Sequence, residues 1–198
     1  MLGRRNPFIA NEGVPILAIV FVLGILIIRY FDPLIAVIPV VLLVLFYLIF
    51  RDPRRSVPSV ALGVFSPVDG QIASVDTVEK GATGVPALRI LIDIDSFGTY
   101  TARSPVEGSI KDLRKKALWL KTDEDEDVVL TFSGYRFGFA PRAFVRYGER
   151  LGQGQRCAYL RLTRRAEIQI PVDGKVLVEP GQTVVAGTDL IGNVPSSR

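Results

Sequence analysis

Two long apolar runs near the N-terminus limit what this chain can fold into more than any other feature of its sequence. Residues 14–28 and 34–50 contain no charged side chain. A bilayer span needs about 20 apolar residues, with a range of roughly 17–25. The second run is therefore long enough, and the first needs the help of residues 8–10 or a locally thinned bilayer. We predict an N-terminal transmembrane helical hairpin, with residues 1–50 as the membrane anchor.

The segment between the two runs contains Arg29, Asp32 and Pro33. Charged residues and a helix-breaking proline are typical of the tip of a helical hairpin. The alternative is a re-entrant wedge, which enters one leaflet and returns on the same side. Both arrangements leave the rest of the chain on one side of the membrane.

Basic residues flank both open ends of the predicted hairpin: Arg4 and Arg5 precede the first run, and Arg51, Arg54 and Arg55 follow the second. Because positively charged flanks stay on the cytoplasmic side, we expect a protein of the bacterial inner (cytoplasmic) membrane, with both termini and the soluble domain in the cytoplasm. The three later arginines either anchor the helix or bind lipid headgroups. Near an anionic surface each basic residue contributes about 1 kcal/mol to such binding.

The chain has no histidine and only one cysteine, Cys157. This excludes catalytic triads with histidine, Cys-His dyads, histidine-ligated metals, internal disulfides and cysteine-cluster metal sites. Residues 123–127 are five consecutive acids. Contiguous acids on an extended chain cannot all face one ion, so a solvated hairpin tip is a better interpretation than a cation site. The net charge of +4 does not indicate nucleic-acid binding, and we expect neither a metal nor a cofactor.

The remainder of the chain, residues 51–198, has the pattern of a β-rich cytoplasmic domain. Short β-branched stretches alternate with Gly, Pro and Asp, which is typical of an all-β sandwich or barrel. The stretches are residues 71–75, 87–95, 109–113, 128–132, 158–162, 167–170, 175–179 and 183–185. A Pro-Val-acid-Gly motif recurs at 67–70, 105–108 and 171–174, and each copy predicts a tight turn with its glycine in a left-handed conformation. The last copy and the residues after it look like the capped hairpin of a lipoyl-like, barrel-sandwich fold.

Aromatic and basic residues gather between positions 135 and 147, a composition favoured in the cores of protein interfaces. A hydrophobic strand pair near the membrane explains the composition equally well. The candidate interface residues are Tyr135, Phe137, Phe139, Phe144 and Tyr147.

Several motifs occur in an order and spacing that together are specific. Residues 12–15 read Glu-Gly-Val-Pro, residues 66–70 read Ser-Pro-Val-Asp-Gly, and residues 103–108 read Arg-Ser-Pro-Val-Glu-Gly. They are similar to Glu-Gly-Trp-Pro, Ser-Pro-Ala-Asp-Gly and Arg-Ala-Pro-Val-Ser-Gly of one family. Residues 50–58 resemble the segment with which its members leave the membrane. Nearly end to end, the chain resembles the small, membrane-anchored type of the phosphatidylserine/archaetidylserine decarboxylase family.

Members of this family are proenzymes that cleave their own chain. The resemblance therefore implies the following self-cleavage reaction. An aspartate and a histidine assist a serine that breaks a Gly-Ser bond, and this serine becomes a pyruvoyl group. By the resemblance, Asp69 stands at the aspartate, Tyr100 at the histidine, and Thr163 and Arg164 at the Gly-Ser pair. Arginine has no hydroxyl group, and tyrosine, with a pKa of about 10, is a poor base at neutral pH. We therefore expect these positions to be degenerate, with no catalytic residues, and the chain not to be an enzyme.

A chain that keeps its hairpin and β domain without this chemistry keeps surfaces for binding. We expect a pseudoenzyme, acting as a structural or accessory subunit of a larger membrane protein complex, respiratory, photosynthetic or other. Its partners are then membrane lipids and other integral membrane subunits. One alternative is an enzyme of phospholipid metabolism that decarboxylates a serine-headgroup phospholipid. Another is a module that binds a lipid headgroup near Asp69 without turnover, with Arg103 as a further headgroup ligand.

Overall fold

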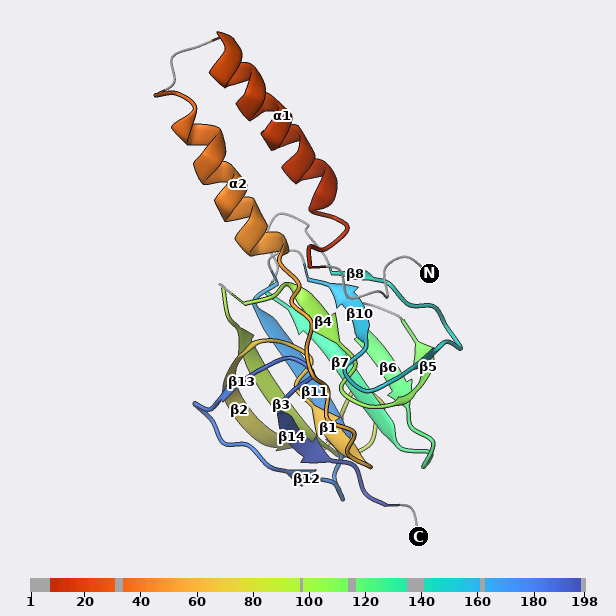
Figure 1. The fold of residues 1–198 in the computed structure, drawn as a ribbon. Helices are drawn as coiled ribbons and strands as arrows, with labels where there is room; N and C mark the ends of the chain where they lie inside the picture. The colour runs from red at the N-terminus through yellow and green to blue at the C-terminus, as the bar shows by residue number, and fades with distance from the viewer. Residues whose placement is uncertain are drawn as a thin grey trace.

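The chain begins with two helices and continues as a β-rich body. The computed structural model describes residues 8–30, 34–96, 98–113, 117–134, 141–160 and 163–196. The helices are α1 (Val14–Tyr30) and α2 (Val37–Phe50). Figure 1 shows them side by side as a hairpin that projects from one end of the body.

Neither helix in the described part of the chain is long and apolar enough to cross a membrane. α1 has 17 residues and α2 has 14. At 1.5 Å per residue they are about 26 and 21 Å long, shorter than the roughly 30 Å hydrocarbon core of a bilayer. The length of the second apolar run overestimates the length of the second helix. Residues 34–36 form a turn, and α2 begins only at Val37. The predicted transmembrane hairpin is therefore wrong, and the expected integral localisation in the bacterial inner membrane with cytoplasmic termini is not supported.

The body consists of antiparallel strands, so the mainly-β part of the predicted fold is confirmed. One sheet has the order β13-β2-β3-β11-β7-β6-β5-β9, a second β1-β14-β12, and a third β4-β10-β8. The strands are β1 (Gly63–Phe65), β2 (Gly70–Val78), β3 (Ala87–Ile94), β4 (Thr101–Arg103), β5 (Gly108–Asp112), β6 (Ala117–Lys121), β7 (Asp127–Ser133), β8 (Arg142–Ala143), β9 (Arg150–Leu151), β10 (Arg156–Tyr159), β11 (Arg165–Pro171), β12 (Lys175–Val176), β13 (Thr183–Val184) and β14 (Leu190–Asn193).

The repeated Pro-Val-acid-Gly motif begins a strand at each of its three positions. β2 starts at Gly70, β5 starts at Gly108, and β12 starts directly after Gly174. None of these glycines has a positive φ, so the predicted left-handed conformation is wrong. Glycine is required for another reason: a Cβ at Gly70 would lie 2.2 Å from the Asp93 carbonyl oxygen, and other carbonyl oxygens crowd the other two glycines at 2.4 and 2.8 Å.

The foot of the hairpin packs on the core of the body. Phe50, the last residue of α2, stacks on Tyr159 of β10 with ring centroids 6.0 Å apart. The backbone N–H of Ala10 donates to the Phe50 carbonyl oxygen at 2.7 Å. Both Ala10 and Phe50 belong to the same buried hydrophobic cluster as the strands. The division into an anchor of residues 1–50 and a domain of residues 51–198 stays a prediction.

Candidate functional site

Asp69 lies where four segments of the chain meet. Its Oδ2 accepts hydrogen bonds from the Arg55 guanidinium at 2.7 Å and from the Thr99 N–H and hydroxyl at 3.1 and 2.9 Å. Its Oδ1 accepts one from the Ala186 N–H at 2.8 Å. The carboxylate therefore joins the turn before β2 to the segment after α2, to the segment before β4 and to the loop after β13.

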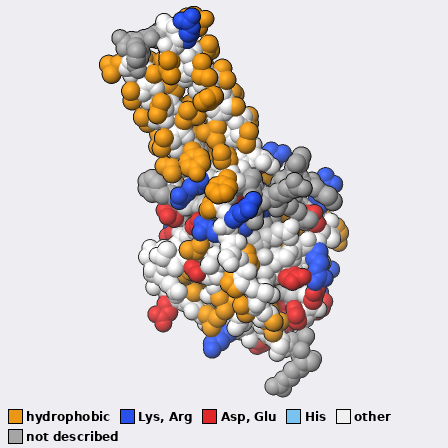
Figure 2. All heavy atoms as spheres, viewed as in Figure 1, with side chains coloured by type: hydrophobic (Ala, Val, Ile, Leu, Met, Phe, Trp, Pro, Cys, Tyr) orange, Lys and Arg blue, Asp and Glu red, His pale blue; other side chains and the backbone are white. Residues whose placement is uncertain are grey.

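A cavity of about 610 Å³ opens beside Asp69. Arg51 and Arg55, which follow α2 directly, bring two positive charges to it, and Asp93 and Asp95 at the end of β3 bring negative charges. Figure 2 shows Lys and Arg side chains gathered where the apolar hairpin meets the body. The lining residues are Arg51, Arg55, Asp69, Gly70, Gln71, Asp93, Ile94, Asp95, Ser96, Gly98, Thr183, Val184 and Val185. We call this cavity the foot pocket, since it lies at the foot of the hairpin.

Tyr100, at the family's histidine position, is buried. Its hydroxyl donates to the Ser96 carbonyl oxygen at 3.0 Å. Burial raises the pKa of Tyr100, and Asp95 raises it further, while Arg164 acts in the opposite direction. A phenol with a raised pKa, already bonded to a backbone carbonyl, is not arranged to take a proton from a nucleophile.

Thr163 and Arg164, at the family's cleavage pair, are held in backbone hydrogen bonds. The Thr163 hydroxyl and N–H both donate to the Leu160 carbonyl oxygen, and the Thr163 side chain is buried. The Arg164 carbonyl oxygen accepts from the Ile94 N–H at 2.8 Å, and the next N–H, that of Asp95, donates to the Asp69 carbonyl oxygen at 3.0 Å. The structure thus brings all four family positions to one end of β3, although Asp69, Tyr100 and Thr163 each bond elsewhere.

Arg103, a predicted headgroup ligand, lies in a buried ionic cluster with only 2% of its surface exposed. Its guanidinium contacts Asp52 Oδ1 at 3.2 Å, and Arg156 Nε contacts Asp52 Oδ2 at 2.6 Å. Thr101 also donates to Asp52, at 3.2 Å. Of the other predicted headgroup ligands, Arg51 and Arg55 line the foot pocket and Arg54 is exposed; their lipid-binding role stays a prediction.

Sequence reasoning missed the partners of these groups: Asp52, Thr99 and Arg156. Arg156 comes beside Arg103 through the antiparallel pairing of β10 with β4, and nothing in the local sequence indicates that pairing. The sequence gives one weak indication of the role of Asp52. If the residues after the second apolar run only anchored a helix at a membrane surface, an acid among these basic residues would not be expected.

The predicted partner interface is only partly described. Tyr135, Phe137 and Phe139 lie outside the described residues. Phe144 is half-buried under the Arg156 guanidinium, whose carbon lies 5.0 Å from the ring centroid. Tyr147 is 75% exposed. An interface role for these side chains stays a prediction.

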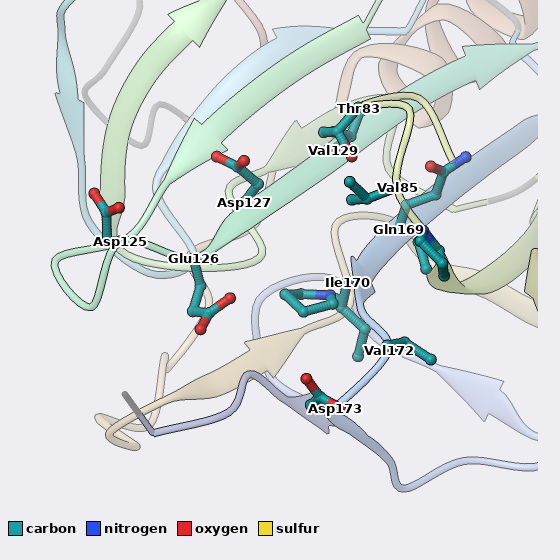
Figure 3. Close-up of a pocket in the computed structure, with 13 residues that line it drawn as sticks. Thr83, Val85, Asp125, Glu126, Asp127, Val129, Gln169, Ile170, Val172 and Asp173 are labelled. Carbon is teal, nitrogen blue, oxygen red and sulfur yellow. The ribbon is translucent and has the colours of Figure 1, made fainter. Parts of the chain in front are cut away.

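The acidic run lies on the turn between β6 and β7, which confirms the predicted hairpin tip. Figure 3 shows Asp125, Glu126 and Asp127 of this turn beside a second cavity, of about 260 Å³, that Asp173 also lines. Burial raises the pKa of Glu126, and Asp127 and Asp173 add to the shift. Among the residues that the structure describes, no three His, Cys, Asp or Glu side chains are grouped to hold a metal ion.

Comparison with known proteins identifies relatives over nearly the whole chain. A scan against models of protein families found no match. "Phosphatidylserine decarboxylase proenzyme" of Nitrosomonas eutropha is 32% identical over 201 residues, which cover 91% of this chain and 93% of the relative. The protein of the same name from Burkholderia mallei is 31% identical over 213 residues, 98% of this chain and 99% of the relative.

Among solved structures, glucose permease IIA from Mycoplasma capricolum is similar at 21% identity and a TM-score of 0.49. The match covers 66% of this chain and 94% of the permease chain. The decarboxylase relatives are enzymes by name, so the expectation that this chain is not an enzyme is contradicted, and the expected pseudoenzyme or accessory subunit is unsupported. The chain belongs to the phosphatidylserine decarboxylase family.

Proposed function

We propose that the chain is an enzyme of phospholipid metabolism that acts on a phospholipid with a serine headgroup. The observation that carries the proposal is the identity of about 31% to phosphatidylserine decarboxylase proenzymes over 91–98% of the chain. The foot pocket is the place where we propose that the headgroup binds, because Asp69, at the family's aspartate position, lines it.

The charges of the foot pocket complement those of a serine headgroup. This headgroup has a phosphodiester anion, an ammonium cation and a carboxylate anion. Guanidinium groups bind phosphate and carboxylate oxygens with paired hydrogen bonds, which suits Arg51 and Arg55. Asp93 and Asp95, on the β3 side of the pocket, suit the ammonium group.

In this proposal Asp69 orients Arg55 rather than acting as a base. Both carboxylate oxygens accept hydrogen bonds, and a side chain held from several segments has a fixed direction. Arg55 is thereby held in the lining of the pocket, where it can contact the phosphate. Loss of Asp69 would leave Arg55 without its 2.7 Å partner.

The residues at the cleavage position do not fit the pyruvoyl group of the family. The Arg164 side chain has no hydroxyl oxygen to attack a carbonyl, and the Thr163 hydroxyl is bonded to the Leu160 carbonyl. A threonine would also leave a methyl group on the product and so give a ketobutyryl group. Thr163 and Arg164 therefore do not supply a pyruvoyl group.

This misfit favours a second candidate function, selective binding of a serine headgroup without its conversion. Binding would use the same foot pocket and the same residues, Arg51 and Arg55. The two candidates differ in product alone. Decarboxylation releases carbon dioxide and leaves an ethanolamine headgroup, whereas binding leaves the serine headgroup unchanged.

Mass spectrometry of the lipids after incubation of the full chain with serine-lipid vesicles distinguishes the candidates. We expect an ethanolamine-headgroup lipid to accumulate with the unaltered chain and not with Arg55→Leu. Arg89→Leu is the matched control, because Arg89 makes an exposed ion pair with Asp76, away from the pocket. Selective binding without product would support the second candidate, and the absence of both would contradict the two together.

A further inference from the structure

Tyr100 ties the connection between β3 and β4 to the core of the body. The structure describes residues 95, 96 and 98–100 of this connection. The Tyr100 hydroxyl donates to the Ser96 carbonyl oxygen at 3.0 Å. The Tyr100 carbonyl oxygen accepts from the Leu160 N–H at 2.8 Å, and the ring belongs to the buried hydrophobic cluster. The ring therefore has a fixed position, and its hydroxyl holds the backbone of the exposed residue Ser96.

The same connection is bound closely to Asp69. The Asp95 N–H donates to the Asp69 carbonyl oxygen at 3.0 Å, and the Thr99 N–H and hydroxyl donate to the Asp69 carboxylate. Gly98 comes so near that a Cβ on it would lie 2.9 Å from the Asp69 Cβ and 3.3 Å from the Asp95 Cβ. With the Tyr100 hydroxyl bond, each described residue of the connection is thus held in place.

This connection forms part of the wall of the foot pocket, which Asp95, Ser96 and Gly98 line. The hydroxyl of Tyr100 therefore holds the residue next to Asp95, one of the two carboxylates that suit the ammonium group. Burial raises the pKa of Tyr100, and the Asp95 carboxylate raises it further, which indicates that the two side chains interact across the connection. A shift of the Ser96 backbone would move the Asp95 carboxylate with it.

We propose that Tyr100 is a positioning residue for headgroup recognition, whose hydroxyl fixes the Ser96 backbone and thereby places the Asp95 carboxylate for the ammonium group of a serine headgroup. The inference rests on the proposed function of the foot pocket. It gives the residue at the family's histidine position a role that needs no proton transfer. Charge-assisted hydrogen bonds from an ammonium group to a carboxylate form at about 2.7–2.9 Å, and they weaken when the carboxylate is displaced.

Two soluble probes isolate the contribution of the ammonium group. Phosphoserine and 3-phosphoglycerate share a phosphate and a carboxylate, and they differ in an ammonium group that replaces a hydroxyl group. Calorimetric titration of the full chain with each probe gives the ratio of the two dissociation constants. We expect the unaltered chain to bind phosphoserine about tenfold more tightly, because of the charge-assisted bond to Asp95.

Tyr100→Phe keeps the buried ring and removes only the hydroxyl. It should lower the preference for phosphoserine to about twofold and change the affinity for 3-phosphoglycerate by less than about twofold. Tyr147→Phe is the matched control, because it removes the same hydroxyl from a side chain that is 75% exposed, and it should keep the full preference.

Two further variants separate positioning from a general effect on the fold. Gly98→Ala should also lower the preference with the Tyr100 hydroxyl in place, since its Cβ would crowd Asp69 and Asp95. Asp95→Asn should remove the preference. Adding Tyr100→Phe to Asp95→Asn should then have no further effect, because the hydroxyl acts through that carboxylate.

The inference is overturned if Tyr100→Phe keeps the full preference of the unaltered chain, a result that leaves the proposed function standing. Equal weakening of both probes by Tyr100→Phe would also overturn it, as would a further loss of preference when Tyr100→Phe is added to Asp95→Asn. Equal affinity of the unaltered chain for the two probes would contradict the proposed function, and the inference with it.

Discussion

The hairpin and the body place the same kind of side chain in opposite surroundings. Ile25 of α1 is 52% exposed, whereas Ile168 of β11 is fully buried. The body hides its apolar residues behind antiparallel sheets, and the charged groups Asp52, Arg103 and Arg156 are buried with them. The hairpin buries little besides Val20 and Gly24 of α1 and Pro39 and Phe50 of α2. One chain therefore contains a region that buries its apolar side chains and a region that leaves most of them exposed.

The joint between the two regions should give the largest effect on stability. Asp52→Ala would leave Arg103 and Arg156 buried without their carboxylate partner. Breaking a buried ion pair in this way costs about 3–5 kcal/mol. The check is denaturant unfolding followed by the fluorescence of Trp119, which is the only tryptophan and lies in the body. Asp76→Ala, which breaks an exposed pair with Arg89, is the control and should cost about 0–1 kcal/mol.

Matched side-chain truncations in the two regions test directly whether they differ in packing. Leu130→Ala, at a fully buried position of β7, should lower the free energy of unfolding by about 2–5 kcal/mol. Ile25→Ala on the hairpin should change the same quantity by no more than about 0.5 kcal/mol. Equal costs for the two would show that the hairpin packs as a core element.

The reactivity of the Cys157 thiol measures how well the interior of the body excludes water. Burial raises the pKa of its thiol to about 12, so it should react with a thiol reagent at least about 100-fold more slowly in the folded than in the unfolded chain. Because the folded-state pKa lies above the ordinary 9.0, the neutral thiol contributes stability that is fully present below pH 9. This contribution is lost as the pH rises towards 12. The alkaline decline in stability should be less steep in Cys157→Ala, and an unchanged slope would contradict the account.

The smallest expected effect is at the acidic turn of the body. Burial and the neighbours Asp127 and Asp173 raise the pKa of Glu126. A raised pKa means that ionisation of Glu126 weakens the fold as the pH rises above the ordinary 4.5. Glu126→Gln should therefore stabilise the chain at pH 7, within about 0.5 kcal/mol, and have no effect at pH 3. Destabilisation at pH 7 would show that the carboxylate has a favourable partner.

The sequence predicted much of the body and little of the site. Alternating β-branched stretches located β2, β3, β5, β7, β10, β11, β12 and β13, because local side-chain pattern is enough to favour a strand. The strands β1, β4, β6, β8, β9 and β14 were missed. β8 and β9 have only two residues each, which is too short for any alternation to show.

The hairpin was predicted with the wrong length, since apolar composition does not show where a helix begins. The buried ionic cluster and the foot pocket could not be predicted either, because residues far apart in the sequence form them. Asp52 is next to Arg51 and Pro53 in sequence, yet its partners Arg103 and Arg156 are distant and are placed by strand pairing. Motifs located Asp69, but only the fold shows that it accepts a hydrogen bond from Arg55.

Headgroup selectivity of the full chain is the most direct test of the central claim that the foot pocket recognises a serine headgroup. Equilibrium binding should be compared between bilayers with serine and with glycerol headgroups, which carry the same net charge. Charge-assisted hydrogen bonds to the extra ammonium and carboxylate should make binding to the serine lipid about tenfold tighter, and Arg55→Leu should abolish the preference. Equal affinity for the two lipids in the unaltered chain would contradict the claim.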